Sequence, residues 1–253
     1  MSGGKLLLAM VTLMAGGCAS ASPSQSLPSG AAGITAWREA REQVDELRRR
    51  YAAQGAYRMN VSLELTQLQL GQRMRARGAV AVRPPHSLRM ILLGPGGTTA
   101  LDLWVCGDAF RFEVPAISLE RRGDANTPPQ QLRGLPVRFL RWWFLEPLGG
   151  RLLAFADEEP GRRFVFRDGP EVVHLLAPTG APLRAERRSS VDVEKLLVRG
   201  LGGCGEVHYD QRSTGLDITV QCEAVTPGSP PEAAFADPDD PSRPCGQDGD
   251  APS

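Results

Sequence analysis

The feature that most constrains this fold is a change of apolar periodicity near residue 55. Before it, apolar residues recur at three- and four-residue spacing, which is typical of one face of an α-helix. After it, apolar and polar residues alternate, which is typical of strands with one buried face. A chain that changes from the first period to the second, and then keeps alternating, predicts an α+β protein dominated by antiparallel strands.

The individual elements follow from this pattern. A helix is expected over residues 37–51, with Thr35 as its N-cap. A second, strongly apolar helix is expected over residues 137–145, between Pro136 and Pro147. Strands separated by Gly- or Pro-containing turns are expected at residues 57–65, 74–82, 88–92, 101–105, 110–114, 164–167, 172–176, 183–191, 206–210 and 216–222. About ten strands with one apolar face need something to cover that face.

The N-terminus has the layout of a signal peptide. Lys5 precedes an apolar run from Leu6 to Ala15, which is shorter than the roughly 20 residues that span a bilayer. Small residues then lead to Cys18, so residues 1–17 are expected to be a lipoprotein signal peptide and Cys18 the site of lipid attachment. The alternative is an ordinary secretory signal with an incidental cysteine. Acyl chains on Cys18 would hold the protein on a membrane, because each buried methylene contributes about 0.8 kcal/mol.

Composition divides the rest of the chain. Residues 18–33 are rich in Ser, Ala, Pro and Gly and are expected to form a flexible tether. Residues 226–253 are dense in Pro, Asp and Gly and predict a disordered acidic tail. The segment between them, residues 34–225, has the size of one domain with a single core.

No pattern in the sequence predicts catalysis. His86, His174 and His208 are isolated from one another, so metal-ligand spacing is absent. The acidic residues 157–159 are typical of a solvated loop, and no nucleophile motif or phosphate-binding loop occurs. The formal net charge of zero implies neither a nucleic-acid footprint nor a polybasic membrane patch. We therefore expect a non-enzymatic protein without cofactor, metal or nucleic-acid partner.

Four cysteines remain after Cys18, and an oxidising compartment allows them to pair. Cys204 and Cys222 flank a predicted hairpin and are equidistant from Ser213. A turn centred on Ser213 would place them opposite each other, whereas a turn centred on residues 214–215 would shift the register. If they pair, Cys106 and Cys245 are left as the second pair.

Two stretches resemble the LolA/LolB family of lipoprotein carriers, and its LolB-like members in particular. Residues 88–103 are similar to the family's strand-turn-strand around an Asn-Pro-Leu-Gly turn. Residues 134–149 are similar to its Gly-hydrophobic-Pro helix that ends near Pro-Gly. The family's turn carries an exposed Leu thought to engage the membrane. The matching position here is Gly96, which cannot insert an apolar side chain.

The resemblance implies a curved, unclosed antiparallel β-barrel whose helices cover its apolar concave face, over residues 34–225. In the family, the cavity on that face receives acyl chains. A filled core is the alternative for the same residues. The candidate cavity and lid residues are Met90, Leu92, Leu101, Leu103, Phe110, Phe112, Phe139, Trp142, Trp143 and Phe144.

The function implied is that of an outer-membrane lipoprotein that faces the periplasm, with Ala19 after Cys18 resembling an outer-membrane sorting signal. It would bind the acyl chains of lipoproteins or lipids and help deliver them to the membrane, with a periplasmic carrier protein as a candidate partner. The alternative is a non-catalytic structural or assembly lipoprotein of the envelope. That protein would use the same fold, with a filled core, to bind a protein partner through the apolar helix.

Overall fold

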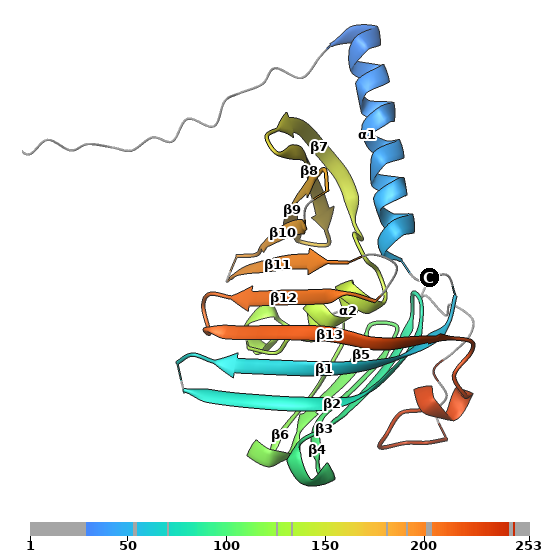
Figure 1. Cartoon of the computed structure of the whole chain (residues 1–253), viewed down its shortest axis with the longest axis vertical. Helices are drawn as coiled ribbons and strands as arrows, with labels where there is room; N and C mark the ends of the chain where they lie inside the picture. The colour runs from blue at the N-terminus through green and yellow to red at the C-terminus, as the bar shows by residue number, and fades with distance from the viewer. Residues whose placement is uncertain are drawn as a thin grey trace, which may run out of the picture.

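The computed structural model describes residues 29–52, 55–69, 71–124, 126–132, 134–180, 182–190, 192–200, 204–242 and 245. Cys18 and the predicted signal peptide lie outside the described residues. The described residues form one antiparallel sheet of thirteen strands with two α-helices (Figure 1). The fold is therefore α+β, with three strands more than the approximate number predicted.

The helices are α1 (Gly30–Tyr51) and α2 (Val137–Phe144). The strands are β1 (Tyr57–Gln67), β2 (Gln72–Arg83), β3 (Ser87–Leu93), β4 (Thr99–Cys106), β5 (Ala109–Val114), β6 (Leu119–Gly123), β7 (Arg151–Glu158), β8 (Gly161–Asp168), β9 (Glu171–Pro178), β10 (Leu183–Arg188), β11 (Val193–Arg199), β12 (Glu206–Gln211) and β13 (Leu216–Pro227). Short 3₁₀ turns are η1 (Pro95–Gly97), η2 (Pro115–Ile117), η3 (Pro129–Leu132) and η4 (Glu232–Phe235).

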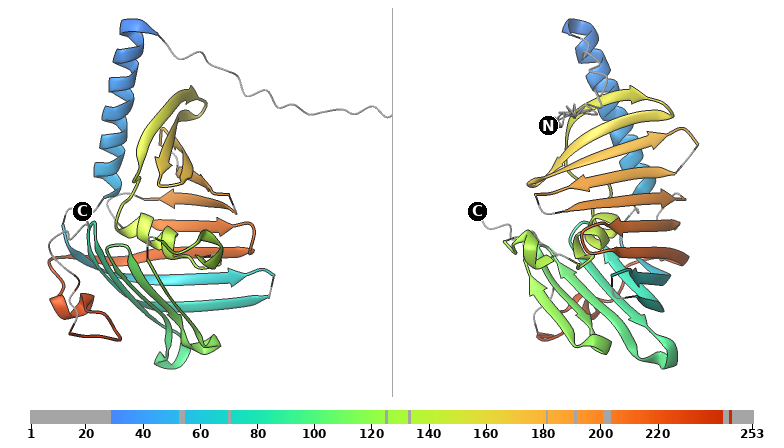
Figure 2. Two further views of the ribbon diagram at one scale, coloured as in Figure 1. Left: turned by 180° about the vertical axis from the view of Figure 1, so that it is seen from behind. Right: turned by 90° about the vertical axis from the view of Figure 1, so that its left-hand side faces the viewer.

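The first and last strands, β1 and β13, lie side by side in the middle of the sheet. β1 pairs with β2 on one side and with β13 on the other. From there one arm runs through β3, β4 and β5 to β6, and the other through β12 to β7. β6 and β7 do not pair with each other, so the sheet is unclosed. The two arms curve toward the same side, and α2 lies on that concave side between them (Figure 2).

Three strands, β6, β7 and β11, were not predicted from the alternation of apolar and polar residues. β6 reads Leu-Glu-Arg-Arg-Gly and is mostly exposed, so it has no buried face to mark it. β7 contains a bulge between Leu152 and Ala154, which moves its side chains out of phase. A single strand was predicted over residues 183–191. The structure instead has a hairpin, in which β11 begins only four residues after β10 ends.

Helix α1 begins earlier than predicted. Its N-cap is Ser29, and residues 30–33, which were expected to belong to the flexible tether, are helical. The prediction of Thr35 as N-cap is wrong. The Thr35 hydroxyl donates to the carbonyl of Ala31, 3.2 Å away, so it is bonded inside the helix rather than at its end.

The end of the chain is also more ordered than predicted. Residues 228–242 and Cys245, which we call the C-terminal strap, lie against the outer face of β3 and β4. Phe235 is fully buried there, and the indole Nε1 of Trp104 donates to its carbonyl at 2.8 Å. A disulfide joins Cys245 to Cys106 at the end of β4. The prediction of a disordered tail is therefore wrong for residues 226–242.

A second disulfide joins Cys204 to Cys222, with Cα atoms 5.1 Å apart. The β12–β13 hairpin pairs Gln211 with Leu216, so its turn is centred on neither of the two places considered from sequence. Cys204 lies two residues before β12 begins, outside the ladder, and for this reason it can reach Cys222 without being its direct partner.

We expect the Cys106–Cys245 disulfide to hold the C-terminal strap on the sheet. In the double variant C106S/C245S, hydrogen exchange of residues 228–242 should become fast. Unfolding free energy should fall by roughly 4–5 kcal/mol, because the crosslink closes a long loop. The matched control C204S/C222S, which opens a loop of 18 residues, should lose less and keep the strap protected. Unchanged protection in C106S/C245S would contradict this role.

The strap should also respond to acid through Asp237. Arg122 holds the pKa of this buried carboxyl at about 2, below the ordinary value. A lowered pKa stabilises the fold above the unfolded-state pKa, and that contribution disappears as pH falls through the folded value. D237N should therefore be less stable than wild type by about 1–3 kcal/mol at pH 7, and the difference should vanish between about pH 4 and pH 2. Urea unfolding across this range measures it, with D240N as the control.

Candidate functional site

The candidate site is the concave face of the sheet together with α2. Inward-facing residues of β3, β4 and β5 supply one wall, and six of the predicted residues lie there: Met90, Leu92, Leu101, Leu103, Phe110 and Phe112. All six are buried in a single apolar core. Their alternation along the strands places them on one side, as each strand's period of two requires.

Helix α2 supplies the cover. It is a short helix that follows Pro136 and buries one broad face consisting of Val137, Phe139, Leu140, Trp142 and Phe144. The ring of Phe139 stacks on Tyr209 of β12, with centroids 4.5 Å apart. Trp143 is half-buried and packs on the edge of the same core. The four aromatic lid candidates therefore all contact the core, and three of them are inside it.

The side of α2 that is not buried in the core is tied to both arms of the sheet. Arg138 forms a close ion pair with Glu171 of β9. Arg141 reaches the other arm, where its guanidinium lies 2.9 Å from Asp108 in the β4–β5 turn. The two pairs bridge the gap between the arms over the helix.

Glu171 is the central acid of this arrangement. Its side chain is buried, and Arg187 of β10 contacts its second carboxylate oxygen at 3.4 Å. Burial raises the pKa of Glu171, while Arg187 and Arg138 act in the opposite direction. Arg187 also contacts Asp168 at 2.9 Å. Sequence reasoning missed Arg138, Arg141 and Glu171 as a group, because they come from elements far apart in the chain.

Tyr209 lies below α2 and was also missed. Its ring is fully buried and its hydroxyl donates to Glu194 of β11 in a close hydrogen bond. Burial, with the charge of Glu194 beside it, raises the pKa of this phenol far above the ordinary value. The hydroxyl therefore stays neutral and serves as a fixed donor.

Little empty space remains under α2. A cavity of about 10 Å³ is lined by Phe139, Trp142 and Tyr209 together with residues of β9, β10 and β11. That is about the smallest space that can hold a single water molecule. In this conformation, the aromatic side chains of α2 occupy the place that the sequence assigned to a ligand.

Trp142 separates this small cavity from an open, charged hollow of about 370 Å³ beside α2. The hollow is lined by Arg138, Arg141 and Arg187 together with carboxylates of the two arms. The indole Nε1 of Trp142 is buried and has no acceptor among the described residues. A buried donor without an acceptor costs about 1–3 kcal/mol, so this atom marks a point where a ligand's oxygen would be stabilised.

Helix α1 secures the segment that leaves α2. Arg48 donates to the carbonyls of Leu148 and Gly150, at 3.1 and 2.7 Å. Ala40 and Val44 are buried against the core, and the ring of Trp37 lies 5.9 Å from that of Phe155 on β7. The predicted amphipathic helix thus covers the β7 arm, next to α2 rather than over it (Figure 2).

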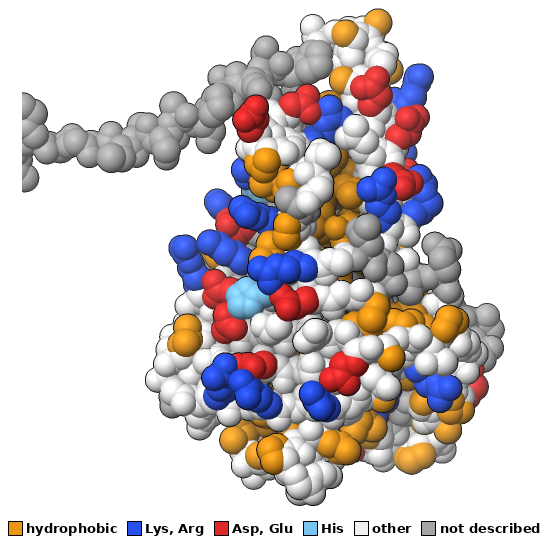
Figure 3. Space-filling model, in the orientation of Figure 1, with side chains coloured by type: hydrophobic (Ala, Val, Ile, Leu, Met, Phe, Trp, Pro, Cys, Tyr) orange, Lys and Arg blue, Asp and Glu red, His pale blue; other side chains and the backbone are white. Residues whose placement is uncertain are grey.

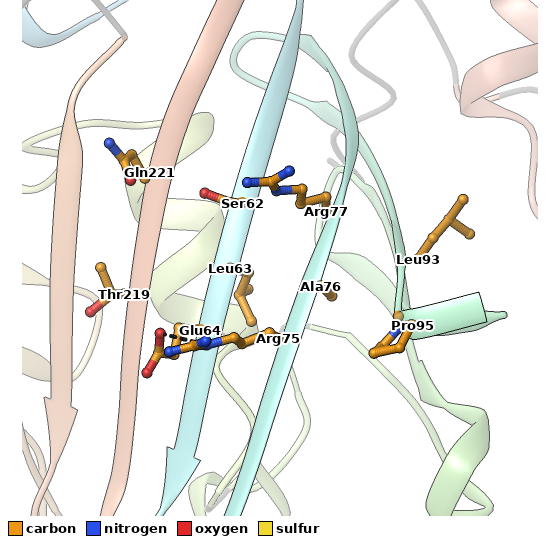
Figure 4. A pocket seen from close by; sticks show the side chains of 11 residues that line it. Ser62, Leu63, Glu64, Arg75, Ala76, Arg77, Leu93, Pro95, Thr219 and Gln221 are labelled. Atoms are coloured by element: carbon orange, nitrogen blue, oxygen red, sulfur yellow. Dashed lines mark hydrogen bonds and ion pairs between the residues drawn. The ribbon is translucent and has the colours of Figure 1, made fainter. Parts of the chain in front are cut away.

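A larger hollow, of about 670 Å³, lies on the opposite, outer face over β13, β1, β2 and β3. Figure 4 shows Glu64 of β1 beside Arg75 of β2 at its lower end, with Ser62, Arg77 and Gln221 above them. Arg73, followed by Arg75, lowers the pKa of Glu64. Its carboxylate is thus already paired, and the hollow is open, with a lining that mixes charged and apolar side chains.

Other site chemistry is absent from the part of the chain that the structure describes. No group of His, Cys, Asp or Glu residues there is arranged to hold a metal ion. Within the same residues, neither helix combines the length and the apolar character needed to cross a bilayer. Gly96 lies in η1, in the turn between β3 and β4, with φ of +82°.

Comparison with known proteins adds a structural likeness. No protein-family model matches the sequence, and no curated protein matches it as a relative. The crystal structure of a LolA superfamily protein from Nitrosomonas europaea is similar to 78% of this chain and 97% of its own, with a TM-score of 0.53 and 11% identity. A domain from Vibrio parahaemolyticus described as an outer membrane lipoprotein-sorting protein gives a TM-score of 0.49 at 10% identity, over 76% of this chain and 94% of its own. The likeness to the Nitrosomonas europaea protein shows that the chain has a LolA-like fold, at low sequence identity.

Proposed function

We propose that this chain is a non-catalytic lipid-binding lipoprotein of the outer membrane, lipidated on Cys18 and facing the periplasm. It binds acyl chains of lipoproteins or lipids under α2 and helps deliver them to the membrane. The observation that carries this proposal is an apolar helix inserted into the concave face of an unclosed sheet with a LolA-like fold. The two disulfides fit an oxidising compartment such as the periplasm.

Binding in this site requires α2 to move. Ligand pockets for small molecules measure roughly 300–1,000 Å³, far more than the cavity beneath Trp142. The side chains of α2 already occupy the concave face, so an acyl chain has to replace them. We infer that α2 is a plug that exchanges with the ligand.

The energies of that exchange are of the same size. Exposing the five buried apolar side chains of α2 would cost roughly 8–15 kcal/mol, at about 1.5–3 kcal/mol each. Burying an acyl chain of about fourteen methylenes returns roughly 11 kcal/mol, at about 0.8 kcal/mol each. Because neither state dominates by a wide margin, a chain can enter and leave, as a carrier needs.

The orphan donor of Trp142 supports the same proposal. An ester or amide carbonyl at the head of an acyl chain can accept a hydrogen bond from Nε1, which has no acceptor among the described residues. The neighbouring charged hollow gives the ligand's polar end access to water. The indole therefore stands between a place for a hydrocarbon tail and a place for a head group.

The filled interior favours a second candidate function. A core packed by α2 is what a structural or assembly lipoprotein would have if it never bound lipid. Its partner would be a protein. The sequence suggested that this partner would bind through the apolar helix. Because the apolar face of α2 is buried, the partner would bind another surface instead.

Lipid uptake separates the two candidates. Purified protein lacking residues 1–18 should take up a fluorescent fatty acid and a lipopeptide. W142F keeps the aromatic volume but removes the donor, so it should bind five- to tenfold less tightly. W143F is the matched control and should bind like wild type, since its ring lies at the edge of the core. If neither ligand is taken up by the wild-type protein, the carrier proposal fails and the scaffold remains.

The plug makes a prediction about destabilised variants. F139A and F235A each remove a buried phenyl ring and should lose about 3–5 kcal/mol of unfolding free energy. Only F139A loosens α2, so only F139A should bind the fatty acid more tightly, because more molecules are open. Phe235 lies in the C-terminal strap on the outer face and controls for general loss of stability. Equal uptake by both variants would argue against a plug.

A further inference from the structure

The outer face of the β8–β12 arm carries a groove that the lipid-binding proposal does not use. It has a volume of about 440 Å³. In Figure 3, which views the outer face, blue side chains gather at the left at the level of β9–β12. We call this the cationic groove; it is lined by Arg163, His174, Leu176, Arg184, Glu186, Arg188, Lys195, Leu197, His208 and Asp210.

Positive charge exceeds negative charge in the groove, since four Arg and Lys side chains line it with two carboxylates. Some of these cations are already paired. Arg163 lies 2.7 Å from Glu158, and Arg188 lies 2.5 Å from Glu186. Arg184 and Lys195 form no ion pair with any described residue. Two cations are therefore available to a ligand.

His174 is a titratable side chain inside the groove, and the charges around it shift its pKa. His174 faces Glu186 on β10 and Val165 on β8. Burial lowers its pKa below the ordinary value, and Arg188 and Arg163 lower it further, while Glu186 and Glu158 act in the opposite direction. The imidazole thus lies in a site where a further positive charge is unfavourable.

We propose that the cationic groove docks an acidic, extended segment of a partner protein. Its length across β8–β12 corresponds to four strand spacings, or about 19 Å, which matches about five or six residues of extended chain. Leu176 and Leu197 give it an apolar floor between charged rims, which suits a peptide with carboxylates and small apolar side chains. A flat lipid surface would touch this convex face only along a line and would not enter the hollow. The proposal does not depend on lipid binding under α2.

The groove can be tested with the full chain and a fluorescein-labelled hexa-glutamate peptide. R184Q/K195Q should weaken peptide binding at least tenfold, because it removes both unpaired cations. The matched control R75Q/R77Q removes the same charge from the same outer face, over β2, and should change binding less than twofold. Equal losses in the two double variants would show general charge attraction and overturn the proposal.

A pH series gives an independent readout. A bound acidic peptide would raise the pKa of His174, so binding should tighten several-fold as pH falls from about 7.5 to 5.5, where the glutamates remain ionised. H174Q should reduce this dependence; the second imidazole of the groove, His208, lies 3.2 Å from Asp217. Vesicles of phosphatidylcholine with 30% phosphatidylglycerol are the competing surface. If the protein binds these vesicles but not the peptide, and R184Q/K195Q abolishes the vesicle binding, the proposal is overturned in favour of a membrane contact.

Discussion

The packing of α2 on the concave face is the contact on which the rest of this structure depends. An unclosed sheet with one apolar side has to bury that side, and the two arms cannot do so alone because β6 and β7 never meet. The broad apolar face of α2 fills the space between them, and Arg138 and Arg141 tie the helix to one arm each. The curvature of the sheet and the position of α2 therefore depend on each other.

The same contact would couple the proposed lipid binding to the stability of the protein. The side chains that complete the core occupy the place a hydrocarbon ligand would need, so a ligand has to replace part of the protein's own core. A short helix with few polar ties is suited to such an exchange. The outer face, by contrast, carries ion pairs, the C-terminal strap and a disulfide, and its contacts do not involve α2.

Much of this architecture could be predicted because it follows from local patterns. Alternation located β1 to β5, and the run between Pro136 and Pro147 located α2. The resemblance to lipoprotein carriers anticipated the LolA-like fold. The elements that were missed are those whose burial does not repeat along the chain: β6 at an exposed edge, β7 with its bulge, and the strap, which is held by Phe235 and by the distant Cys106.

By itself, the sequence determined which residues are apolar on alternate positions, and hence which side of each strand is buried and that a cover is needed. It could not determine how tightly the cover fits, because packing depends on the distance between the two arms, which only the folded chain sets. The tertiary structure alone decided that α2 fills its site, that Trp142 has a donor without an acceptor, and that Arg184 and Lys195 share one groove. Each of these facts depends on residues from separate elements that are brought together only in the folded chain.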